Sequence, residues 1–358
     1  MKILVTGGAG FIGSNLVHYL LGSSNHELYS EIDVVVTLDK LTYAGSQTRL
    51  AGLETDHRHV FVEGDIGDSA LVSALLREHQ IDAVMHLAAE SHVDRSIDNP
   101  EQFIQTNIVG TYRLLEEIRR FWGDRSCSIR HPRFLHVSTD EVFGSLGVND
   151  AAFSETSPYA PNSPYSASKA ASDHLVRSYH HTYGVPAITT HCSNNFGPYQ
   201  FSEKLVPLMI RKLLSDNRLP VYGEGANIRD WIYVEDHCRG LVKVLVRGIP
   251  GTNYVIGGRC EMTNLKMVRA IIEIFRELAP NRCKQSEEEL IMYVKDRPGH
   301  DLRYAVNPER IERELGWAPR EDIMSGLRRT VQWYLDHEEW IFDTSEGNYH
   351  GERLGNPS

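Results

Sequence analysis

The feature that most restricts the fold of this chain is a glycine-rich turn in its first segment, MKILVTGGAGFIGSNLV. A short apolar run, Lys2 to Val5, precedes the turn, and apolar residues at helical spacing follow it from Phe11 to Leu21. Such runs indicate a buried strand and an amphipathic helix. A second apolar run, Ile32 to Leu38, ends at Asp39. We therefore predict a strand, a glycine turn, a helix and a parallel strand.

The same alternation of strand and helix continues to Cys192. Strands joined by helices at this spacing indicate a parallel sheet with helices on both faces. The predicted fold class is α/β, a Rossmann-like doubly wound parallel sheet with a smaller C-terminal α/β substrate lobe. The further predicted strands are His59–Val62, Ala83–Leu87, Arg133–Ser138 and Ala187–Cys192, and the further predicted helices are Ser69–His79, Pro100–Arg120 and Ser163–Tyr183.

After Asn194 the alternation becomes irregular, which indicates the second unit. We assign residues 1–193 and about 231–256 to the nucleotide-binding domain, 194–230 and 257–340 to the substrate lobe, and 341–358 to a polar tail. A Gly-containing polar turn separates two β-rich runs in LPVYGEGANIRDWIYVEDH, and Ser286 to Glu289 is expected as a Glu-rich surface stretch. The other predicted elements are a strand from Thr252 and the helices Ser202–Ser215, Asp236–Arg247, Asn264–Ala279 and Ile323–His337.

The glycine turn predicts a dinucleotide site. Gly7, Gly10 and Gly13 permit a tight turn and a close approach of the backbone to a diphosphate, and the following helix N-terminus supplies amide donors. Glycine spacing alone is a weak signal, and its position between the first strand and the first helix makes it a strong one. Asp39 would accept hydrogen bonds from a ribose 2′-hydroxyl and repel a 2′-phosphate, which favours NAD over NADP. The alternative is that Asp39 only ends a strand.

Composition and charge limit the partners. The net charge of -11 disfavours nucleic acid. No run approaches the roughly 20 apolar residues of a membrane span, so we expect a soluble protein without a membrane partner. Because MKILVTGG enters a strand at once, we expect no export signal and a cytoplasmic location. The five cysteines lack C-x-x-C spacing, and His86, His92 and His136 fit no ligand pattern, so no metal is expected.

The segment YSASK at 165–169 predicts a catalytic base. Tyr165 and Lys169 are one helical turn apart and share a helix face, so the ammonium can lower the phenol pKa. A phenolate near neutral pH can take a proton from an alcohol while a hydride leaves its carbon. The alternative is an ordinary amphipathic helix face.

The segment VSTDEVFG at 137–144 predicts additional proton transfers. It places two acids, Asp140 and Glu141, directly after Thr139, and a simple dehydrogenase does not need both of them. Oxidation of an alcohol would then be only the first of several steps. The alternative for the acid pair is a solvated turn or the start of a helix.

With these residues the chain resembles the extended short-chain dehydrogenase/reductases, and among them the dTDP-glucose 4,6-dehydratase family. The resemblance runs from Lys2 to about His337. The Thr-Asp-Glu run is its most restrictive part, because nucleotide-sugar epimerases usually lack that acidic pair. The matching motifs are TGGAGFIG, LDKLTYAG, HLAAESHVDRSI, TNIVGTYRLLE, STDEVFG, SPYSASKAASDHLV, SNNFGPYQFSEKLVPLMI, IRDWIYVEDH and DRPGHDLRYA.

The resemblance implies a lyase that converts dTDP-glucose to dTDP-4-keto-6-deoxyglucose and water with bound NAD. Tyr165, held ionised by Lys169 and aided by Thr139, would take the C4 hydroxyl proton while hydride passes to NAD. Glu141 would remove the C5 proton, protonated Asp140 would donate to the departing C6 hydroxyl, and the hydride would return to C6. Burial beside the other carboxylate is expected to raise the pKa of Asp140.

The resemblance also implies the residues of both binding sites. The expected cofactor residues are Gly7, Gly10, Phe11, Ile12, Gly13, Asp39, Lys40, Leu41, Thr42, Asp65, Ile66, Leu87, Ala88, Ala89, Ser91, Thr106, Tyr165, Lys169 and Asn195. The expected substrate residues are Ser91, Thr139, Asn194, Lys204, Leu205, Pro220, Tyr222, Arg229, Asn264, Arg297 and His300. Lys204, Arg229 and Arg297 are cations that suit a diphosphate. Ordinary packing or surface exposure is the alternative for each residue.

Two departures from the family pattern concern the sugar site. Phe143 stands where the family commonly has Tyr, and the loop between Glu141 and Tyr165 is shorter. Three other functions stay open, namely the same dehydration of UDP-glucose, a C4 epimerase that needs only the Tyr–Lys pair, and a non-catalytic nucleotide sensor or scaffold. The resemblance further implies a homodimer in which Pro100–Arg120 and Ser163–Tyr183 form a four-helix bundle with their symmetry mates, and a tetramer stays open.

Overall fold

A seven-stranded sheet, in the order β10-β6-β5-β4-β1-β2-β3, is the centre of the molecule. This computed structural model describes residues 1–22, 31–124, 129, 131–296 and 300–346. All neighbouring strands of the sheet are parallel, which confirms the predicted α/β class. The strands are β1 (Lys2–Thr6), β2 (Val34–Asp39), β3 (His59–Glu63), β4 (Ala83–His86), β5 (Arg133–Thr139), β6 (Ala187–Cys192) and β10 (Asn253–Ile256).

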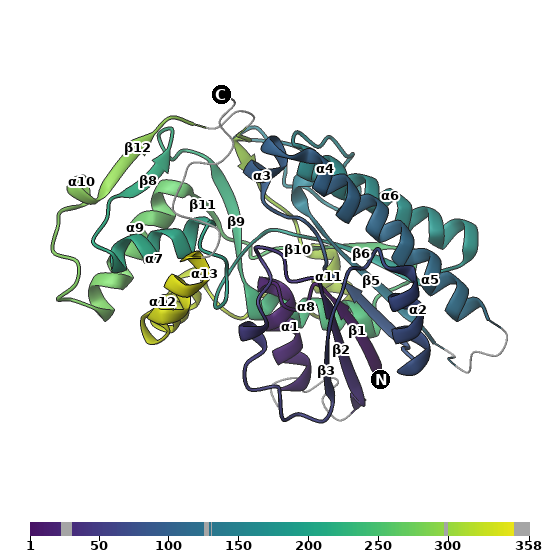
Figure 1. The fold of residues 1–358 in the computed structure, drawn as a ribbon. Coiled ribbons are helices and arrows are strands. Elements are labelled where there is room, and N and C mark those ends of the chain that lie inside the picture. Colours follow the sequence, from purple (N-terminus) through teal and green to yellow (C-terminus); the bar gives the residue numbers. More distant parts are fainter. Residues whose placement is uncertain (23–30, 125–128, 130, 297–299, 347–358) are drawn as a thin grey trace.

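Helices cover both faces of the sheet (Figure 1). One face packs against α1 (Phe11–Leu21), α8 (Val234–Arg247) and α11 (Glu309–Leu315), and the other packs against α2 (Ser69–Glu78), α5 (Thr111–Gly123) and α6 (Pro164–Tyr183). The strands carry side chains on both faces, so each face has its own apolar core, as a buried parallel sheet requires.

Helix α6, which carries the Tyr–Lys pair, has strong signals at both ends. Ser163 and Ser166 form a capping box at its start, and Pro164 occupies the first turn, where a missing N–H costs nothing. Gly184 ends the helix with a φ of 72°, a left-handed conformation that glycine adopts without strain. These local signals explain why the sequence predicted the limits of this helix well.

The predicted helix Pro100–Arg120 is interrupted, which corrects the sequence expectation. It consists of α4 (Pro100–Phe103), a π-helical segment η3 (Ile104–Gly110) and α5. Segment η3 buries Thr106 and Asn107, and the Asn107 amide donates to Ser168 Oγ at 2.8 Å and to the Glu90 carbonyl at 3.0 Å. The extra residue of a π-turn is fixed by such tertiary contacts and leaves no mark on apolar periodicity.

The second unit is built around two small sheets. Strand β9 (Ile228–Tyr233) joins β11 (Glu261–Thr263), β13 (Arg303–Tyr304) and β7 (Asn194–Phe196), and β8 (Leu219–Tyr222) pairs with β12 (Ile291–Val294). These strands pack with a set of helices into a separate apolar core. The helices are α7 (Leu205–Leu214), α9 (Asn264–Leu278), α10 (Glu287–Leu290), α12 (Ile323–Asp336) and α13 (Glu338–Glu346).

Three expected boundaries need correction. Ile311, Leu315 and Trp317, expected in the lobe, pack in the core of the nucleotide-binding domain with α1 and α8. Residues 231–233, expected in that domain, end β9 in the lobe's sheet. The polar tail was expected from residue 341, but α13 continues to Glu346 and Ile341 is fully buried. Apolar contacts made between distant segments decide these three points.

Within the described ranges, no helix has both the length and the apolar character needed to cross a bilayer.

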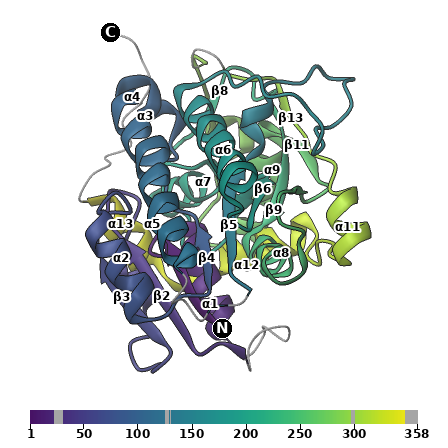
Figure 2. The same ribbon diagram turned by 90° about the vertical axis from the view of Figure 1, so that its right-hand side faces the viewer.

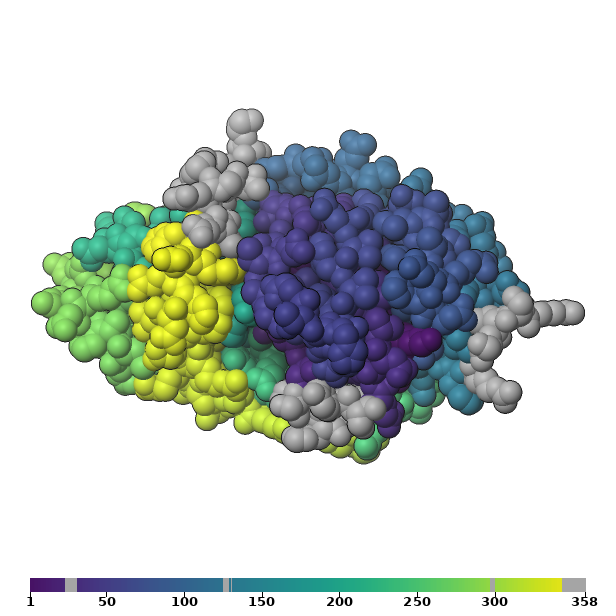
Figure 3. All heavy atoms as spheres, turned by 60° about the horizontal axis from the view of Figure 1, so that its bottom comes forward, coloured from purple at the N-terminus to yellow at the C-terminus, as the bar shows by residue number. Residues whose placement is uncertain are grey.

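The space-filling view in Figure 3 shows the C-terminal helices lying beside the N-terminal part of the chain.

Candidate active site

Close backbone contacts explain the glycines of the first turn. Gly7 has a φ of 72°, and a Cβ added to it would lie 2.6 Å from the Ala88 nitrogen. A Cβ on Gly13 would lie 2.1 Å from the Gly7 carbonyl oxygen. Both contacts are with backbone atoms, which cannot rotate away as a side chain can. The turn therefore forms a shallow cradle in which only glycine fits at these two positions. This shape suits the close approach of a diphosphate.

Asp39, at the end of β2, supports this cradle. Its carboxylate accepts hydrogen bonds from the backbone N–H groups of Ala9 and Leu41, each at 2.9 Å. Burial raises the pKa of Asp39, and the two backbone hydrogen bonds oppose this effect. Each carboxylate oxygen retains an acceptor position, and Asp39 lines the adjoining cavity. The cradle and this acceptor fit a dinucleotide with a free ribose 2′-hydroxyl.

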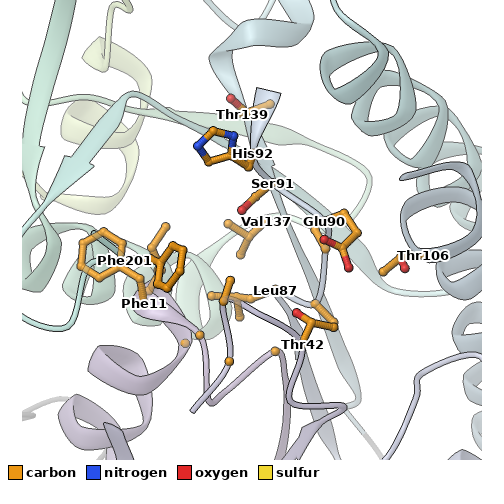
Figure 4. A pocket seen from close by; sticks show the side chains of 18 of the residues that line it. Phe11, Thr42, Leu87, Glu90, Ser91, His92, Thr106, Val137, Thr139 and Phe201 are labelled. Atoms are coloured by element: carbon orange, nitrogen blue, oxygen red, sulfur yellow. The ribbon is translucent and has the colours of Figure 1, made fainter. Parts of the chain in front are cut away.

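One cavity contains most of the expected cofactor residues. Figure 4 shows Phe11 and Phe201 beside each other on one wall, with Thr139 and His92 toward one end and Thr42 toward the other. The expected cofactor residues that line the cavity are Gly7, Gly10, Phe11, Ile12, Gly13, Asp39, Lys40, Thr42, Ile66, Leu87, Ala88, Ala89, Ser91, Thr106, Tyr165, Lys169 and Asn195.

Two expected cofactor residues lie outside this cavity. Leu41 contributes its backbone N–H to Asp39, and its φ of 51° turns the chain there. Asp65 lines a neighbouring polar groove, where its carboxylate is 3.6 Å from the Lys40 ammonium. The same ammonium donates to Thr106 Oγ1 at 2.8 Å, and Lys40 lines both the cavity and the polar groove.

The acid pair begins where β5 ends. Thr139 is the last residue of β5 and caps the short 3₁₀ turn η4 (Asp140–Phe143), because its Oγ1 accepts from the Glu141 N–H at 3.3 Å. The same hydroxyl donates to Asp140 Oδ1 at 3.4 Å. Thr139, Asp140 and Glu141 all line the cavity that contains the glycine turn. The carboxyl ends of the parallel strands thus bring these groups together.

Asp140 lies in an environment that favours the neutral form of its carboxyl group. It is 2% exposed, and its Oδ2 has no hydrogen-bond partner within the described part of the chain. Burial raises the pKa of Asp140 well above its usual range, and the nearby charges of Glu141 and Asp230 raise it further. This direction agrees with the sequence expectation. Asp140 can therefore carry a proton that it can donate near neutral pH.

Tyr165 and Lys169 both line the cavity, but one sequence expectation about them is wrong. Burial raises the pKa of the Tyr165 phenol well above its usual value, and Glu141 raises it further, while a hydrogen bond with Thr139 opposes the change. The Lys169 ammonium donates to the Val137 carbonyl at 2.9 Å. The phenol pKa is therefore raised and not lowered as expected, because burial disfavours the ionised phenol.

A second cavity adjoins the first on the side of the lobe. Glu141, Asn194 and Lys204 line both cavities, so Glu141 lies at their junction, while Asp140 lines the first cavity. The expected substrate residues found in the second cavity alone are Leu205, Pro220, Tyr222, Arg229, Asn264 and His300. Ser91 and Thr139 line the first, and Arg297 lies outside the described residues. Two cavities that meet at Glu141 can hold two ligands whose reacting parts come together there.

The second cavity contains a residue that the sequence analysis did not select. Tyr304 lines the wall, and the Arg229 guanidinium lies 4.4 Å from the centre of its ring, a cation–π contact. The Arg229 side chain also donates to the carbonyl groups of Ile228 and Asp301. Tyr304 belongs to the quoted motif DRPGHDLRYA, so the signal was present in the resemblance.

Comparison with known proteins gives consistent results. A protein-family model described as GDP-mannose 4,6 dehydratase matches residues 4–330. A dTDP-glucose 4,6-dehydratase of Xanthomonas campestris pv. campestris (strain B100) is 53% identical over 353 residues, 98% of each chain. The dTDP-glucose 4,6-dehydratase 1 of Escherichia coli (strain K12) is 50% identical over 358 residues, 98% of this chain and 97% of the relative.

Solved structures show the same similarity. A dTDP-glucose 4,6-dehydratase from Streptomyces venezuelae, crystallised with NAD bound, has a TM-score of 0.88 at 44% identity, covering 96% of this chain and 100% of that one. A UDP-glucose 4-epimerase from Thermotoga maritima has a TM-score of 0.80 at 25% identity, covering 94% of this chain and 100% of that one.

Proposed function

The chain belongs to the dTDP-glucose 4,6-dehydratase family, and we propose that it converts dTDP-glucose to dTDP-4-keto-6-deoxyglucose and water with NAD as cofactor. One observation supports this most directly. Asp140, whose pKa burial raises, lines the cavity with the glycine turn, and its neighbour Glu141 lines both that cavity and the cavity of the lobe. An elimination needs such an acid and base within reach of one sugar ring.

The chain's own groups account for binding of the cofactor and for the first proton transfer. The glycine turn, Asp39 and Lys40 would hold NAD. When bound, NAD supplies the hydride acceptor and donor and a positively charged ring, and a positive charge in this cavity favours the ionised phenol. Tyr165 then accepts the proton of the sugar hydroxyl, and its hydrogen bond with Thr139 opposes the rise in the phenol pKa.

The acid pair performs the elimination. Glu141 lines both cavities and removes the proton next to the new carbonyl group, whose electron withdrawal makes that C–H acidic. Asp140 donates its proton to the departing hydroxyl group, which leaves as water. Burial favours the protonated form of Asp140, which suits this residue to donate a proton while Glu141 accepts one.

The substrate would lie across the two cavities, with the sugar at their junction. We assign the nucleoside diphosphate to the lobe, where Lys204 and Arg229 supply positive charge and Tyr222 and Tyr304 supply aromatic faces. The alternatives are weaker. An epimerase needs no acid pair, and the Thermotoga maritima epimerase is 25% identical, against 44% for the Streptomyces venezuelae dehydratase.

The test is a product assay with the purified protein and no added reductant. We expect dTDP-glucose to give the alkali-dependent ultraviolet absorbance of a 4-keto-6-deoxy sugar, with UDP-glucose tested in parallel. Faster turnover of UDP-glucose would transfer the assignment to the UDP-glucose dehydratase. Formation of a C4 epimer without that absorbance, or no conversion of either nucleotide sugar, would refute the proposal.

We further propose a cytoplasmic homodimer in which the α5 and α6 regions form the subunit contact. Three large apolar side chains in these regions are about half exposed, at 48% for Ile104, 46% for Tyr112 and 55% for Tyr183. Packing against a second copy would remove them from water. Sedimentation equilibrium measures the oligomeric state, and a monomer at micromolar concentration contradicts this part of the proposal.

A further inference from the structure

Behind the catalytic residues lies a buried carboxylate that accepts hydrogen bonds from several directions. Asp173, on α6, is 3% exposed and accepts from Ser138 Oγ at 2.8 Å and from the Tyr159 hydroxyl at 3.0 Å. The ring nitrogens Nε2 of His136 and His191 lie 3.0 and 3.1 Å from it. An ionised carboxylate only accepts, so both imidazoles donate to it through Nε2–H.

These bonds keep Asp173 ionised. Burial by itself raises the pKa of a carboxyl group, but the hydrogen bonds from His136 and His191 prevail and hold the pKa of Asp173 far below its usual range. Burial lowers the pKa of His136 to about 4, so its imidazole is neutral near pH 7. Asp173 is therefore a permanent negative charge in the core.

The position of Asp173 on α6 relates it to the catalytic residues. Tyr165, Lys169 and Asp173 follow one another at intervals of one helical turn, so they share one helix face. Figure 2 shows α6 lying beside β5 and β6. The bonds from His136 and Ser138 join this face to β5, whose last residue is Thr139. Asp173 thus connects α6, which carries Tyr165, to β5, which leads directly into the acid pair.

The charge of Asp173 matters to Lys169. The Lys169 side chain is buried, and burial lowers the pKa of its ammonium group. Among the groups that oppose this effect, Asp173 is the strongest and Cys192 follows. The titratable groups around the Lys169 ammonium are Tyr165 and Asp173 on α6, His86 on β4, His136 on β5 and Cys192 on β6.

We propose that Asp173 is a positioning residue for the reaction, which holds the Tyr165–Lys169 face of α6 against β5 and supplies the buried negative charge that balances the Lys169 ammonium. This inference rests on the proposed function for its kinetic test. Its electrostatic part concerns Lys169 itself and is measurable without substrate.

The kinetic test uses Asp173→Asn, which keeps the volume and removes the charge. With less negative charge nearby, Lys169 loses its proton at lower pH. The alkaline limb of the kcat/KM profile should move to lower pH by about one unit, and kcat near neutral pH should fall by about tenfold or more. A purely structural defect lowers kcat without moving that limb, so an unmoved limb overturns the proposal.

Tyr159→Phe is the matched control. It removes the hydroxyl, which donates to the same carboxylate and lies 2.9 Å from His191 Nε2, and keeps the ring contacts with Phe143 and His191. We expect its pH profile and kcat to stay within about twofold of the unaltered protein. An equal shift of the limb in this variant contradicts the charge argument.

A direct titration separates this inference from the proposed function. The protein is labelled at the lysine ε-carbon, and Lys169→Arg identifies the Lys169 resonance by its loss. In Asp173→Asn the NMR titration midpoint of Lys169 should fall by about one pH unit. An unchanged midpoint overturns the proposal that Asp173 balances the charge of Lys169, even if the protein catalyses no dehydration. A lowered midpoint supports that proposal.

A further variant keeps the test open if Asp173→Asn does not fold, as judged by near-ultraviolet circular dichroism. Ser138→Ala removes one bond between the carboxylate and β5 but keeps the charge. We expect kcat to fall by about tenfold with an unchanged Lys169 midpoint, and Ser138→Thr, which restores the hydroxyl, to recover activity. A kcat equal to that of the unaltered protein overturns the positioning role.

Discussion

At the scale of single residues, the two neighbouring acids differ because their surroundings differ. Asp140 is 2% exposed and lies near the charges of Glu141 and Asp230, so it holds its proton. Glu141 is partly exposed and lines both cavities. Adjacent positions in the chain can therefore serve as the acid and the base that the proposed elimination needs, which two equally solvated carboxylates could not do.

Replacing Glu141 with Gln tests the base. The amide keeps the shape of the side chain and cannot accept a proton near neutral pH, so we expect kcat to fall by about 100-fold or more, with the NAD content of the purified protein unchanged. The exposed Glu288→Gln is the control and should leave kcat as it is. Turnover of Glu141→Gln within about threefold of the unaltered protein would contradict the role assigned to Glu141.

At the scale of elements, an ion pair joins three parts of the chain next to Tyr43 and His92, two residues that line the first cavity. Helix α3 (Val93–Asp98) carries Arg95. Its Nε and Nη2 atoms donate to the two carboxylate oxygens of Glu203. The same guanidinium lies 3.8 Å from the centre of the Tyr43 ring. The Glu203 side chain is only 1% exposed and also lies 3.2 Å from His92 Nε2. Arg95 therefore joins the loop after β2 to the start of the lobe.

Replacing Arg95 with Met tests this connection. The change keeps a long apolar side chain but leaves the buried Glu203 carboxylate without its main partner. An unpaired buried charge lowers the stability of the folded protein. We expect the wall to loosen and NAD to leave about tenfold faster, measured by exchange with labelled NAD after gel filtration. Arg328→Met, which removes an ion pair with Glu277 inside the lobe, is the control. Equal release rates from the two variants would refute this role of Arg95.

At the scale of the whole molecule, the end of the described chain supports its beginning. Arg49 is 1% exposed and donates to the Ala9 carbonyl at 3.0 Å and to the Tyr199 carbonyl at 3.1 Å. Its guanidinium lies 5.4 Å from the centre of the Trp340 ring on α13. Burial lowers the pKa of Arg49 to about 10, so it stays charged near neutral pH. The glycine turn thus depends on contacts with both units.

Buried histidines make the stability of the fold depend on pH. His237 is fully buried, its Nδ1 lies 2.9 Å from Asn195 Oδ1, and burial lowers its pKa from 6.5 to about 3. Between these pH values the unfolded chain binds a proton that the folded chain does not. Stability is therefore lost as the pH falls below about 6.5.

We expect His237 alone to reduce the free energy of unfolding by about 2 kcal/mol between pH 7 and pH 5. Urea unfolding at the two pH values measures this loss. His237→Asn should lose correspondingly less on acidification, although it is less stable at pH 7. The exposed His181→Gln should show the same pH dependence as the unaltered protein. The same dependence in His237→Asn would refute the assignment.

The sequence by itself determined the features that neighbouring residues encode. Apolar periodicity gave the parallel sheet and most of its helices, and the ends of α6 were marked by Ser163 and Gly184. The spacing of Gly7, Gly10 and Gly13 and the pairing of Tyr165 with Lys169 pointed to one site, and these residues do line one cavity. Such signals are local, because backbone conformation depends mainly on residues within a few positions.

The tertiary structure alone decided the properties that depend on distant residues. The π-turn in η3, the burial of α13 and the stacking of Arg229 on Tyr304 arise from contacts that no short segment contains. The protonation of Asp140 and Tyr165 depends on burial and on charges brought from other elements, which is why the expected effect of Lys169 on the phenol was wrong. Desolvation and charge coupling are sums over the surrounding space, and the order of residues along the chain does not give that space.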